Sequence, residues 1–413
     1  MTSKISSKTE SKISCLEISK QRGYPNNPLP EINKSKEKEI TLLRAKKIRM
    51  LLSPKEQKIF SVWFYVCDYY YNLGIKYYKE NKGINLSSFT FRDLIKKEGN
   101  KNKEIRKQIK KFSIPSHVIN DYILDVYKAY ISAIKAVGSN KCKTKHFRLR
   151  YKKHDARRKT IPIPYEKNGN SNYFSRNKLW KNIKFEGNFK VSEINHDCRF
   201  QYDRLLGKYY LFVPYDKKCS NEHSNNLIAL DPGVRTFLTG VTNNYDFYEL
   251  NISKKLEKLL SKISKKDRLF RSDKAKTKFK RKINKKISNL VDDFQWKTCK
   301  YLCSNFNEIL IGKINTISIL SKKNNCLSPE TKKKLQTLSH YSFRQKLKSK
   351  AEEYNNKVYE IDEAYTSMTC FNCKWKNKKL GGNKDFHCDN CGITVSRDFN
   401  AAINIREKHF KRF

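Results

Sequence analysis

Residues 225–252 read NNLIALDPGVRTFLTGVTNNYDFYELNI, and this stretch decides the fold of the second half of the 413-residue chain. It contains three apolar runs, at 225–231, 237–243 and 246–252, separated by a Pro-Gly turn and a short Asn-rich turn. Runs of this length bounded by turn residues are typical of strands. We therefore predict three consecutive strands joined by tight turns.

Further apolar runs follow this meander in a regular order. After a basic segment, apolar residues at helical spacing predict an amphipathic helix, and a buried strand, EILIGKI, is expected over 308–314. A helix across 328–354, a strand over 357–362 and a last helix from about Ser396 complete the chain. A three-stranded meander followed by α-β-α-β-α is the element order of an RNase H-type sheet, so we expect an RNase H-like α/β domain over 225–413.

Residues 41–224 are predicted to form a second lobe of strands and helices. A strand over 41–52 leads into a helix that begins at SPKEQKIF, with the serine as N-cap. A second helix is expected over 116–137, and alternating residues over 180–215 predict short strands of a small β-barrel or sheet. The Ser/Lys/Asn-rich residues 1–40 are predicted to be a disordered basic tail. The chain is thus expected to be an α+β multidomain protein.

The composition is strongly basic. The chain has 89 Lys and Arg residues against 40 Asp and Glu residues, a formal net charge of +49, which favours a polyanion as the partner. An anionic membrane surface is the alternative partner, but no apolar run approaches the length of a spanning helix. The N-terminus lacks the apolar core of a signal peptide, so we expect an intracellular protein with reduced thiols.

Contact with nucleic acid is expected to concentrate in one segment. In residues 141–159, KCKTKHFRLRYKKHDARRK, ten of nineteen residues are Lys or Arg, and two aromatic residues lie between them. A solvated charged face is the alternative interpretation, but the charge density and the interleaved rings favour contact with phosphates and bases. The candidate nucleic-acid-binding residues are Lys145, Arg148, Arg150, Lys152 and Lys153.

Four cysteines provide the strongest local signal. Cys370 and Cys373 form one CxxC pair, and fourteen residues later Cys388 and Cys391 form a second. Each pair can place two thiolates on one tetrahedral Zn²⁺, and the hairpin between them would close a zinc ribbon, expected over residues 364–395. The neighbouring histidine, His387, could replace one cysteine as a ligand, although simple proximity to the pair is the plainer interpretation. With four protein ligands this zinc would be structural.

Two carboxylates occupy positions suited to a metal-dependent nuclease. Asp231 ends the first predicted strand, and Asp398 opens the last predicted helix. Each has an ordinary explanation, since Asp-Pro-Gly is a common turn and an acid near a helix N-terminus complements the helix dipole. Together they are typical of a site in which two divalent metal ions, about 3.5–4 Å apart, cleave a phosphodiester without a protein nucleophile.

The motifs IALDPGVRTF, EILIGKI and YTSMTCFNC…CDNCGITVSRDFNAAINI resemble the three nuclease segments and the zinc ribbon of the TnpB/Fanzor family. The resemblance is strong over about 226–413, looser over 41–224 and absent over 1–40. It implies a transposon-linked, RNA-guided DNA endonuclease with a RuvC-type active site, related to type V CRISPR effectors. It also implies that 41–224 holds the wedge and recognition regions, which bind guide RNA and DNA.

One departure from the family pattern concerns the third carboxylate. Most bacterial members carry a catalytic glutamate in the strand that matches EILIGKI, whereas Gly312 occupies that position here. Glu308 is no substitute, because it lies about 13 Å back along the strand at the opposite end. The eukaryotic and viral Fanzor branch is similar to this chain in placing a glutamate just before YTS, which implies that Glu363 is the third catalytic carboxylate. Asp362 competes with it, but neighbouring strand residues face opposite ways, and a solvated strand end is the structural alternative.

The resemblance leads to one functional prediction and two alternatives. We expect a Mg²⁺-dependent endodeoxyribonuclease in which Asp231, Glu363 and Asp398 hold two Mg²⁺ ions, while guide RNA and a short adjacent motif select the target double-stranded DNA. A monomeric ribonucleoprotein in the nucleus of a eukaryotic host is expected, encoded by the host or by a virus. The alternatives are a nuclease-inactive RNA-guided DNA-binding protein, favoured by Gly312, and a non-enzymatic zinc-ribbon RNA-binding protein.

Overall fold

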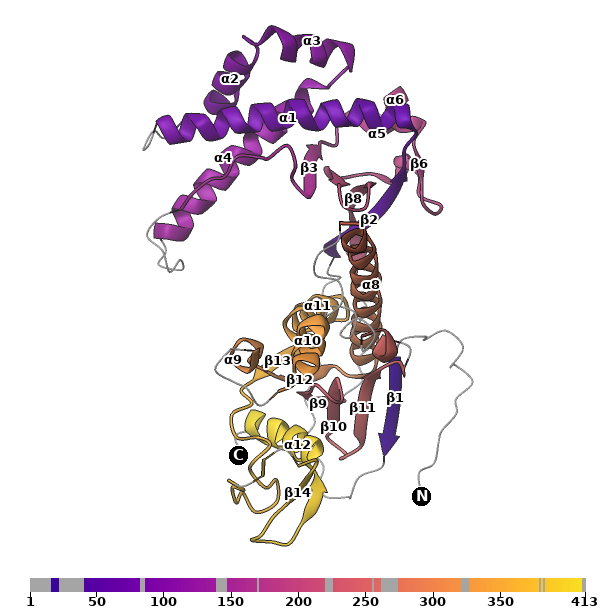
Figure 1. The fold of residues 1–413 in the computed structure, drawn as a ribbon, viewed down its shortest axis with the longest axis vertical. Coiled ribbons are helices and arrows are strands. Elements are labelled where there is room, and N and C mark those ends of the chain that lie inside the picture. The colour runs from indigo at the N-terminus through magenta and orange to yellow at the C-terminus, as the bar shows by residue number, and fades with distance from the viewer. Residues whose placement is uncertain are drawn as a thin grey trace. The chain divides into compact units, whose positions relative to one another are not determined.

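The computed structural model describes residues 16–21, 41–81, 86–138, 147–168, 171–219, 226–254, 256–260, 274–320, 327–378, 380–381 and 383–410 (Figure 1). The chain divides into two units. One unit is Leu43–Lys217, and the other combines Met1–Leu42 with Lys218–Phe413. The two units are described separately below.

The first unit begins as the sequence predicts. Strand β2 (Thr41–Leu51) leads into helix α1 (Pro54–Glu80), and Ser53 caps that helix in a reciprocal capping box with Glu56. The buried side of α1 carries large aromatic residues, including Phe60, which packs against Phe200 with ring centroids 4.6 Å apart. The other elements of the unit are α2 (Ser88–Gly99), α3 (Lys103–Lys111), α4 (Ser116–Gly138), β3 (Arg158–Ile163), β4 (Lys167–Asn168), β5 (Ser171–Asn172), α5 (Tyr173–Arg176), α6 (Lys178–Lys181), β6 (Lys184–Phe185), η2 (Val191–Glu193), β7 (Cys198–Asp203) and β8 (Lys208–Lys218).

Five strands of this unit form a sheet in the order β3-β7-β8-β2-β6, and β4 and β5 pair separately. Among the described strands β3 and β6 are the two end strands, so closure into a barrel stays a prediction. The strand expected at the start of 180–215 is much shorter than predicted. Only Lys184–Phe185 is extended there, because Gly187 turns the chain with φ +84° and a 3₁₀ turn, η2, follows.

The second unit is built around a six-stranded sheet in the order β1-β11-β10-β9-β12-β13. The predicted meander is confirmed: β10 pairs antiparallel with both β9 and β11. Strand β12 runs parallel to β9 on one side and to β13 on the other. The elements of the unit are β1 (Leu16–Gln21), β9 (Leu227–Pro232), β10 (Leu238–Thr242), β11 (Phe247–Ile252), α8 (Lys274–Asn305), β12 (Glu308–Gly312), α9 (Thr316–Leu320), α10 (Pro329–Leu338), α11 (His340–Glu353), β13 (Lys357–Ile361), β14 (Asp385–His387), β15 (Thr394–Ser396) and α12 (Arg397–His409).

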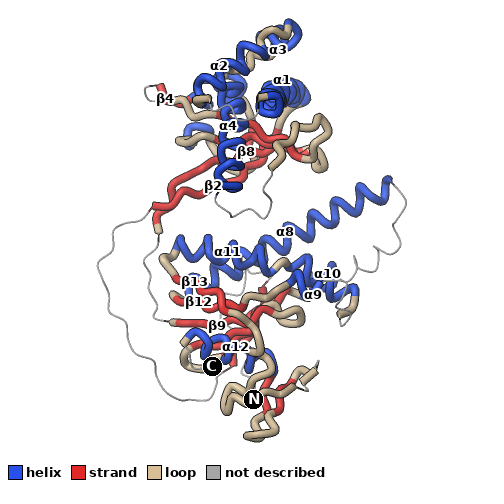
Figure 2. The backbone as a smooth tube through the Cα atoms, turned by 90° about the vertical axis from the view of Figure 1, so that its left-hand side faces the viewer, coloured by secondary structure: helices blue, strands red, loops and turns tan. Residues whose placement is uncertain are grey.

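Helices cover both faces of this sheet, as Figure 2 shows for β9, β12 and β13 between α8 with α11 on one side and α12 on the other. The central strands are apolar and almost wholly buried, which is the pattern of strands packed on both faces. Ile228 and Leu230 pack with the α8 and α11 side, whereas Leu227 and Ala229 pack with the α12 side. The α12 face is the one that bears the candidate site.

Two expectations for this unit are corrected. Residues 1–40 were expected to be disordered, but Leu16–Gln21 forms β1 and pairs antiparallel with the edge of β11, where an unpaired strand offers its backbone groups. The rest of 1–40 lies outside the described residues. The helix expected across 328–354 is two helices, because Ser339 adopts φ +42° and separates α10 from α11.

Candidate active site and zinc site

The sheet brings Asp231 and Gly312 together at the carboxyl ends of β9 and β12. The parallel register pairs Leu230 with Ile311, so the next residues along the two strands, Asp231 and Gly312, are neighbours. Because side chains alternate along a strand, both positions fall on the face that packs against α12, opposite to Leu230 and Ile311. Glu308 is the first residue of β12, at the opposite end of the strand.

Glu363 follows the end of β13, and its side chain lies over Gly312. A Cβ atom built on Gly312 would meet Glu363 Cγ at 2.8 Å and Cδ at 2.9 Å, and its closest contact would be Glu363 Oε1. Any residue other than glycine at position 312 would therefore displace the glutamate. The carboxylate of Glu363 occupies the space above the strand that Gly312 leaves empty.

Helix α12 supplies the third acid. Asp398 lies in the first turn of α12, directly after β15. Burial raises the pKa of Asp231 to about 7, and the negative charge of Asp398 adds to this shift while Arg397 opposes it. Burial also raises the pKa of Glu363 to about 8, and the charge of Asp231 adds to that shift while Arg344 opposes it. The electrostatic interactions thus connect Asp231 to both of the other acids.

This arrangement fits a hard divalent cation. Glu363 Oε1 is buried and has no hydrogen-bond partner among the described residues, and a buried carboxylate oxygen without a partner is costly unless a cation binds it. All three side chains offer oxygen, the ligand that Mg²⁺ prefers. The carboxylate oxygens of the three acids do not all lie within 4.8 Å of one another. Among the described His, Cys, Asp and Glu residues, only the four cysteines form a group with ligand atoms that close.

Asp362 and Glu363 lie in different environments. The Asp362 residue is exposed, whereas Glu363 is half-buried over Gly312. The geometry therefore separates the two acids in the direction that strand alternation predicts.

The four cysteines converge into one cluster. Cys370 Sγ lies 3.7 Å from Cys391 Sγ, and Cys373 Sγ lies 3.4 Å from Cys388 Sγ. Zn–S bonds of about 2.3 Å place the sulfurs of a tetrahedral site about 3.8 Å apart, so the cluster can bind Zn²⁺ with little movement. His387 is not part of the cluster, and its Nδ1 lies 2.9 Å from Thr394 Oγ1.

The two CxxC turns have matching backbones. The amide of Cys370 donates to the carbonyl of Trp375, and the amide of Lys374 donates to the carbonyl of Cys370. The same two bonds recur eighteen residues later, from Cys388 to Ile393 and from Gly392 to Cys388. Lys374 and Gly392, at equivalent positions, both have positive φ, +63° and +73°. Two equivalent knuckles whose cysteines converge, with β14 and β15 paired on either side of the second knuckle, are typical of a zinc ribbon.

The predicted nucleic-acid segment lies in the first unit. Arg148, Arg150, Lys152 and Lys153 are all exposed, and Lys145 lies outside the described residues. Asn72 holds the segment to α1 through two hydrogen bonds with the backbone of Lys152, of 2.7 and 3.1 Å. The described helices include none that is long and apolar enough to span a bilayer.

Comparison with known proteins identifies the family. A model named "Cas12f1-like, TNB domain" matches residues 340–405, and one named "Probable transposase" matches 212–322. A TnpB-like protein of Acanthamoeba polyphaga mimivirus is 32% identical over 396 residues, which cover 89% of this chain and 73% of the viral protein. The chain belongs to the TnpB/Fanzor family.

Two shorter sequence matches agree with this assignment. The CRISPR-associated endodeoxyribonuclease Cas12f1 of Sulfoacidibacillus thermotolerans is 42% identical over 74 residues, 17% of each chain. A TnpB-like protein of Methanocaldococcus jannaschii is 23% identical over 248 residues, 55% of this chain and 80% of that protein. A solved Cas12f1–sgRNA–target DNA complex is 15% identical and covers 88% of this chain and 98% of its own, with a TM-score of 0.35, too low to establish a shared fold.

In this TnpB/Fanzor chain, residues beyond those predicted also contact the region of the site. Asn400 and Asn404 are fully buried on α12, and their amides bind the segment that connects Glu363 to the cysteine cluster. Arg344 is buried, with Nε 3.4 Å from Glu360 Oε1. The sequence did contain a signal for the two asparagines. They lie four residues apart in the otherwise apolar run NAAINI, and polar residues on a buried helix face require hydrogen-bond partners.

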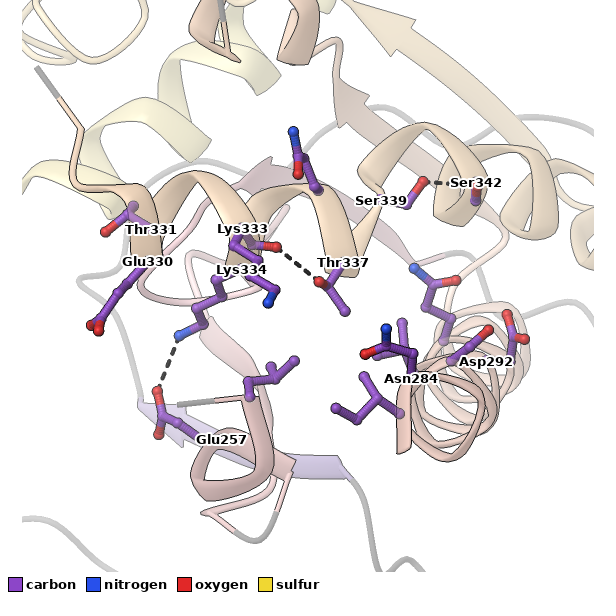
Figure 3. Close-up of a pocket in the computed structure, with 16 residues that line it drawn as sticks. Glu257, Asn284, Asp292, Glu330, Thr331, Lys333, Lys334, Thr337, Ser339 and Ser342 are labelled. Carbon is purple, nitrogen blue, oxygen red and sulfur yellow. Dashed lines mark hydrogen bonds and ion pairs between the residues drawn. The ribbon is translucent and has the colours of Figure 1, made fainter. Parts of the chain in front are cut away.

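One cavity lies apart from these carboxylates. It has a volume of about 600 Å³ and is lined by α8, α10, α11 and the residues after β11 (Figure 3). Lys334 pairs with Glu257 across it at 3.0 Å. Its lining includes none of the predicted catalytic acids or cysteines.

Proposed function

We propose that this TnpB/Fanzor protein is an RNA-guided DNA endonuclease with a RuvC-type site built from Asp231, Glu363 and Asp398. The observation that carries the proposal is the carboxylate of Glu363 over Gly312, with its unpartnered buried oxygen beside Asp231. This position replaces the glutamate that the strand itself lacks, and it weakens the case for a nuclease-inactive protein.

The three acids would hold two Mg²⁺ ions, which when bound activate water and stabilise the leaving oxygen. The protein itself positions the carboxylate oxygens of these acids. Two acids lie at the ends of strands and one lies at the start of a helix, on a sheet that is rigid because it is buried on both faces. The raised pKa values of Asp231 and Glu363 favour proton retention in the absence of metal. Metal binding would therefore release protons from the site.

Guide RNA and target DNA would bind chiefly through the basic surface. Arg148, Arg150, Lys152, Lys153 and, outside the described residues, Lys145 supply positive charge to phosphates. Base pairing with the guide would select the DNA, and the protein would read a short adjacent motif. The four-cysteine cluster would bind one structural Zn²⁺. We further propose a monomeric ribonucleoprotein of the Fanzor branch, encoded by a virus and acting in the nucleus of its eukaryotic host, in keeping with its mimivirus relative.

The experiment is purification of the protein with its RNA, sequencing of that RNA, and a cleavage assay on DNA matching the guide. Mg²⁺-dependent cleavage that is absent in Asp231→Asn supports the proposal. Guided binding without cleavage would indicate a nuclease-inactive DNA-binding protein. If the copurified RNA directs no DNA binding, the result would indicate a non-enzymatic zinc-ribbon RNA-binding protein.

A further inference from the structure

Three side chains of α12 form a stripe along one side of the helix. Asn400, Asn404 and Lys408 are spaced four residues apart, so they lie one above another on the same face. Asp398 lies in the first turn of this helix. The helix that carries one candidate metal ligand therefore also carries this stripe.

Lys408 binds the backbone of the residues immediately before and after Glu363. Its Nζ donates to the carbonyl of Asp362 at 3.1 Å and to the carbonyl of Ala364 at 2.6 Å. Hydrogen bonds from a charged donor are stronger than neutral ones. The peptide units on either side of Glu363 are thus held by one cation from α12.

The asparagines hold the next turn of the same segment. Asn404 Nδ2 donates to the carbonyls of Thr366 at 2.8 Å and Thr369 at 2.6 Å. Asn400 Nδ2 donates to the carbonyl of Thr369 at 2.8 Å, and its Oδ1 accepts from the amide of Phe371. Phe371 directly follows the zinc-cluster residue Cys370.

The held turn connects back to Glu363. The amide and the hydroxyl of Thr366 both donate to the Glu363 carbonyl, at 3.2 and 2.9 Å. Within the turn, Tyr365 adopts φ +65°, a conformation that is unfavourable for a residue with a side chain. Such a conformation persists only where surrounding contacts enforce it, and the α12 contacts lie on both sides of it.

We propose that Asn400, Asn404 and Lys408 are positioning residues that fix Glu363 relative to Asp398, and we call them the α12 clamp. This inference rests on the proposed function, because it assigns the clamp to the site that would hold metal. The need to position this glutamate from outside the sheet is specific to this chain. A glutamate on β12 would be placed by the sheet itself, whereas Glu363 lies beyond the last paired residue of β13, Ile361. A carboxylate on a turn requires another element to place it, and α12 meets that requirement.

The test is Lys408→Met in the complete ribonucleoprotein, with Lys408→Arg as the conservative variant. Lys357→Met is the matched control, because Lys357 is an exposed lysine at the opposite end of β13. We expect the cleavage rate constant of Lys408→Met to fall about 10- to 100-fold, since small misplacements of a reacting group cost this much. Guided DNA binding, zinc content and Tm should stay at native values, and Lys408→Arg should recover part of the rate.

A second readout does not depend on cleavage. Hydrogen exchange of the amides of Thr366, Met368 and Thr369 should accelerate in Lys408→Met and in Asn404→Leu, but not in Lys357→Met. Native exchange and native cleavage in both clamp variants would overturn the clamp. If the native protein does not cleave, the proposed function fails, and the exchange measurement still decides whether α12 fixes this turn.

Discussion

The carboxylate of Glu363 lies directly over the backbone of Gly312, with Glu363 Cγ 2.8 Å from where a Cβ atom of residue 312 would be. The two residues are 51 positions apart in the sequence and lie at the ends of neighbouring parallel strands. The absence of a side chain at one position is what permits the carboxylate at the other. This relationship, the cysteine cluster and the basic segment lead to five predictions.

Replacement of Glu363 by glutamine should remove Mg²⁺-dependent cleavage, by about 100-fold or more, because a neutral amide replaces a carboxylate that would bind metal. Guided DNA binding should persist. The comparison is Asp362→Asn, which alters an exposed side chain and should have a mild effect. The measurement is single-turnover cleavage of guide-matched DNA, and a native rate for Glu363→Gln would show that the third carboxylate lies elsewhere.

Replacement of Gly312 by alanine should also reduce cleavage, because the new Cβ atom would occupy the space of the Glu363 carboxylate. Gly138→Ala is the control, since a Cβ atom there meets nothing within 4 Å. The double variant Gly312→Glu with Glu363→Gly should retain more activity than Gly312→Glu alone, because it restores one carboxylate without the clash. Equal cleavage by native protein and Gly312→Ala would contradict the packing argument.

Stability without added Mg²⁺ should decrease as pH rises. The carboxyls of Asp231 and Glu363, with usual pKa values near 3.8 and 4.5, have folded-state values of about 7 and about 8. The stabilisation from their bound protons is complete below the usual values and is lost as pH rises through the folded-state values. Tm measured between about pH 5 and pH 8 should fall, and the fall should be smaller in Glu363→Gln. If Tm depends on pH identically in Glu363→Gln and in the native protein, the Glu363 carboxyl is not the origin of the fall.

Metal analysis should find about one zinc per chain. Its removal should loosen the ribbon and, through the Asn400–Phe371 hydrogen bond, disturb the turn after Glu363. Cys391→Ser should therefore lower both zinc content and cleavage, whereas His387→Ala should preserve both. A zinc-free protein that folds and cuts normally would disprove the structural zinc.

The salt dependence of guide-RNA binding should be steep. Neutralising Lys145, Arg148, Arg150 and Lys152 together should reduce the slope of log affinity against log salt by about 3, at about 0.7 per phosphate contact. The charge-preserving variant Arg148→Lys with Arg150→Lys should keep the native slope. Affinity that is insensitive to salt in the native protein would argue against electrostatic binding.

The sequence by itself determined the local features of this protein. Apolar residues in short runs bounded by turn residues predicted β9, β10, β11, β12 and β13. The signal is strongest in β9, β10 and β12, because strands buried on both faces are largely apolar. The CxxC spacing predicted the cysteine cluster, because two short knuckles can close a metal site with few alternatives. The sequence also placed Asp231 at the end of a buried strand, and it lies at the end of β9.

Tertiary structure decided how distant residues meet. The break at Ser339 depends on one left-handed backbone conformation, which no periodicity reveals. The α12 clamp requires that buried amides of one helix find carbonyls more than thirty residues earlier, and only packing determines such pairs. Glu363 shows both contributions. The family resemblance indicated the residue, and strand alternation separates it from Asp362. Its place over Gly312 depends on strand order and register, because only the pairing of β12 with β13 brings residues 51 positions apart together.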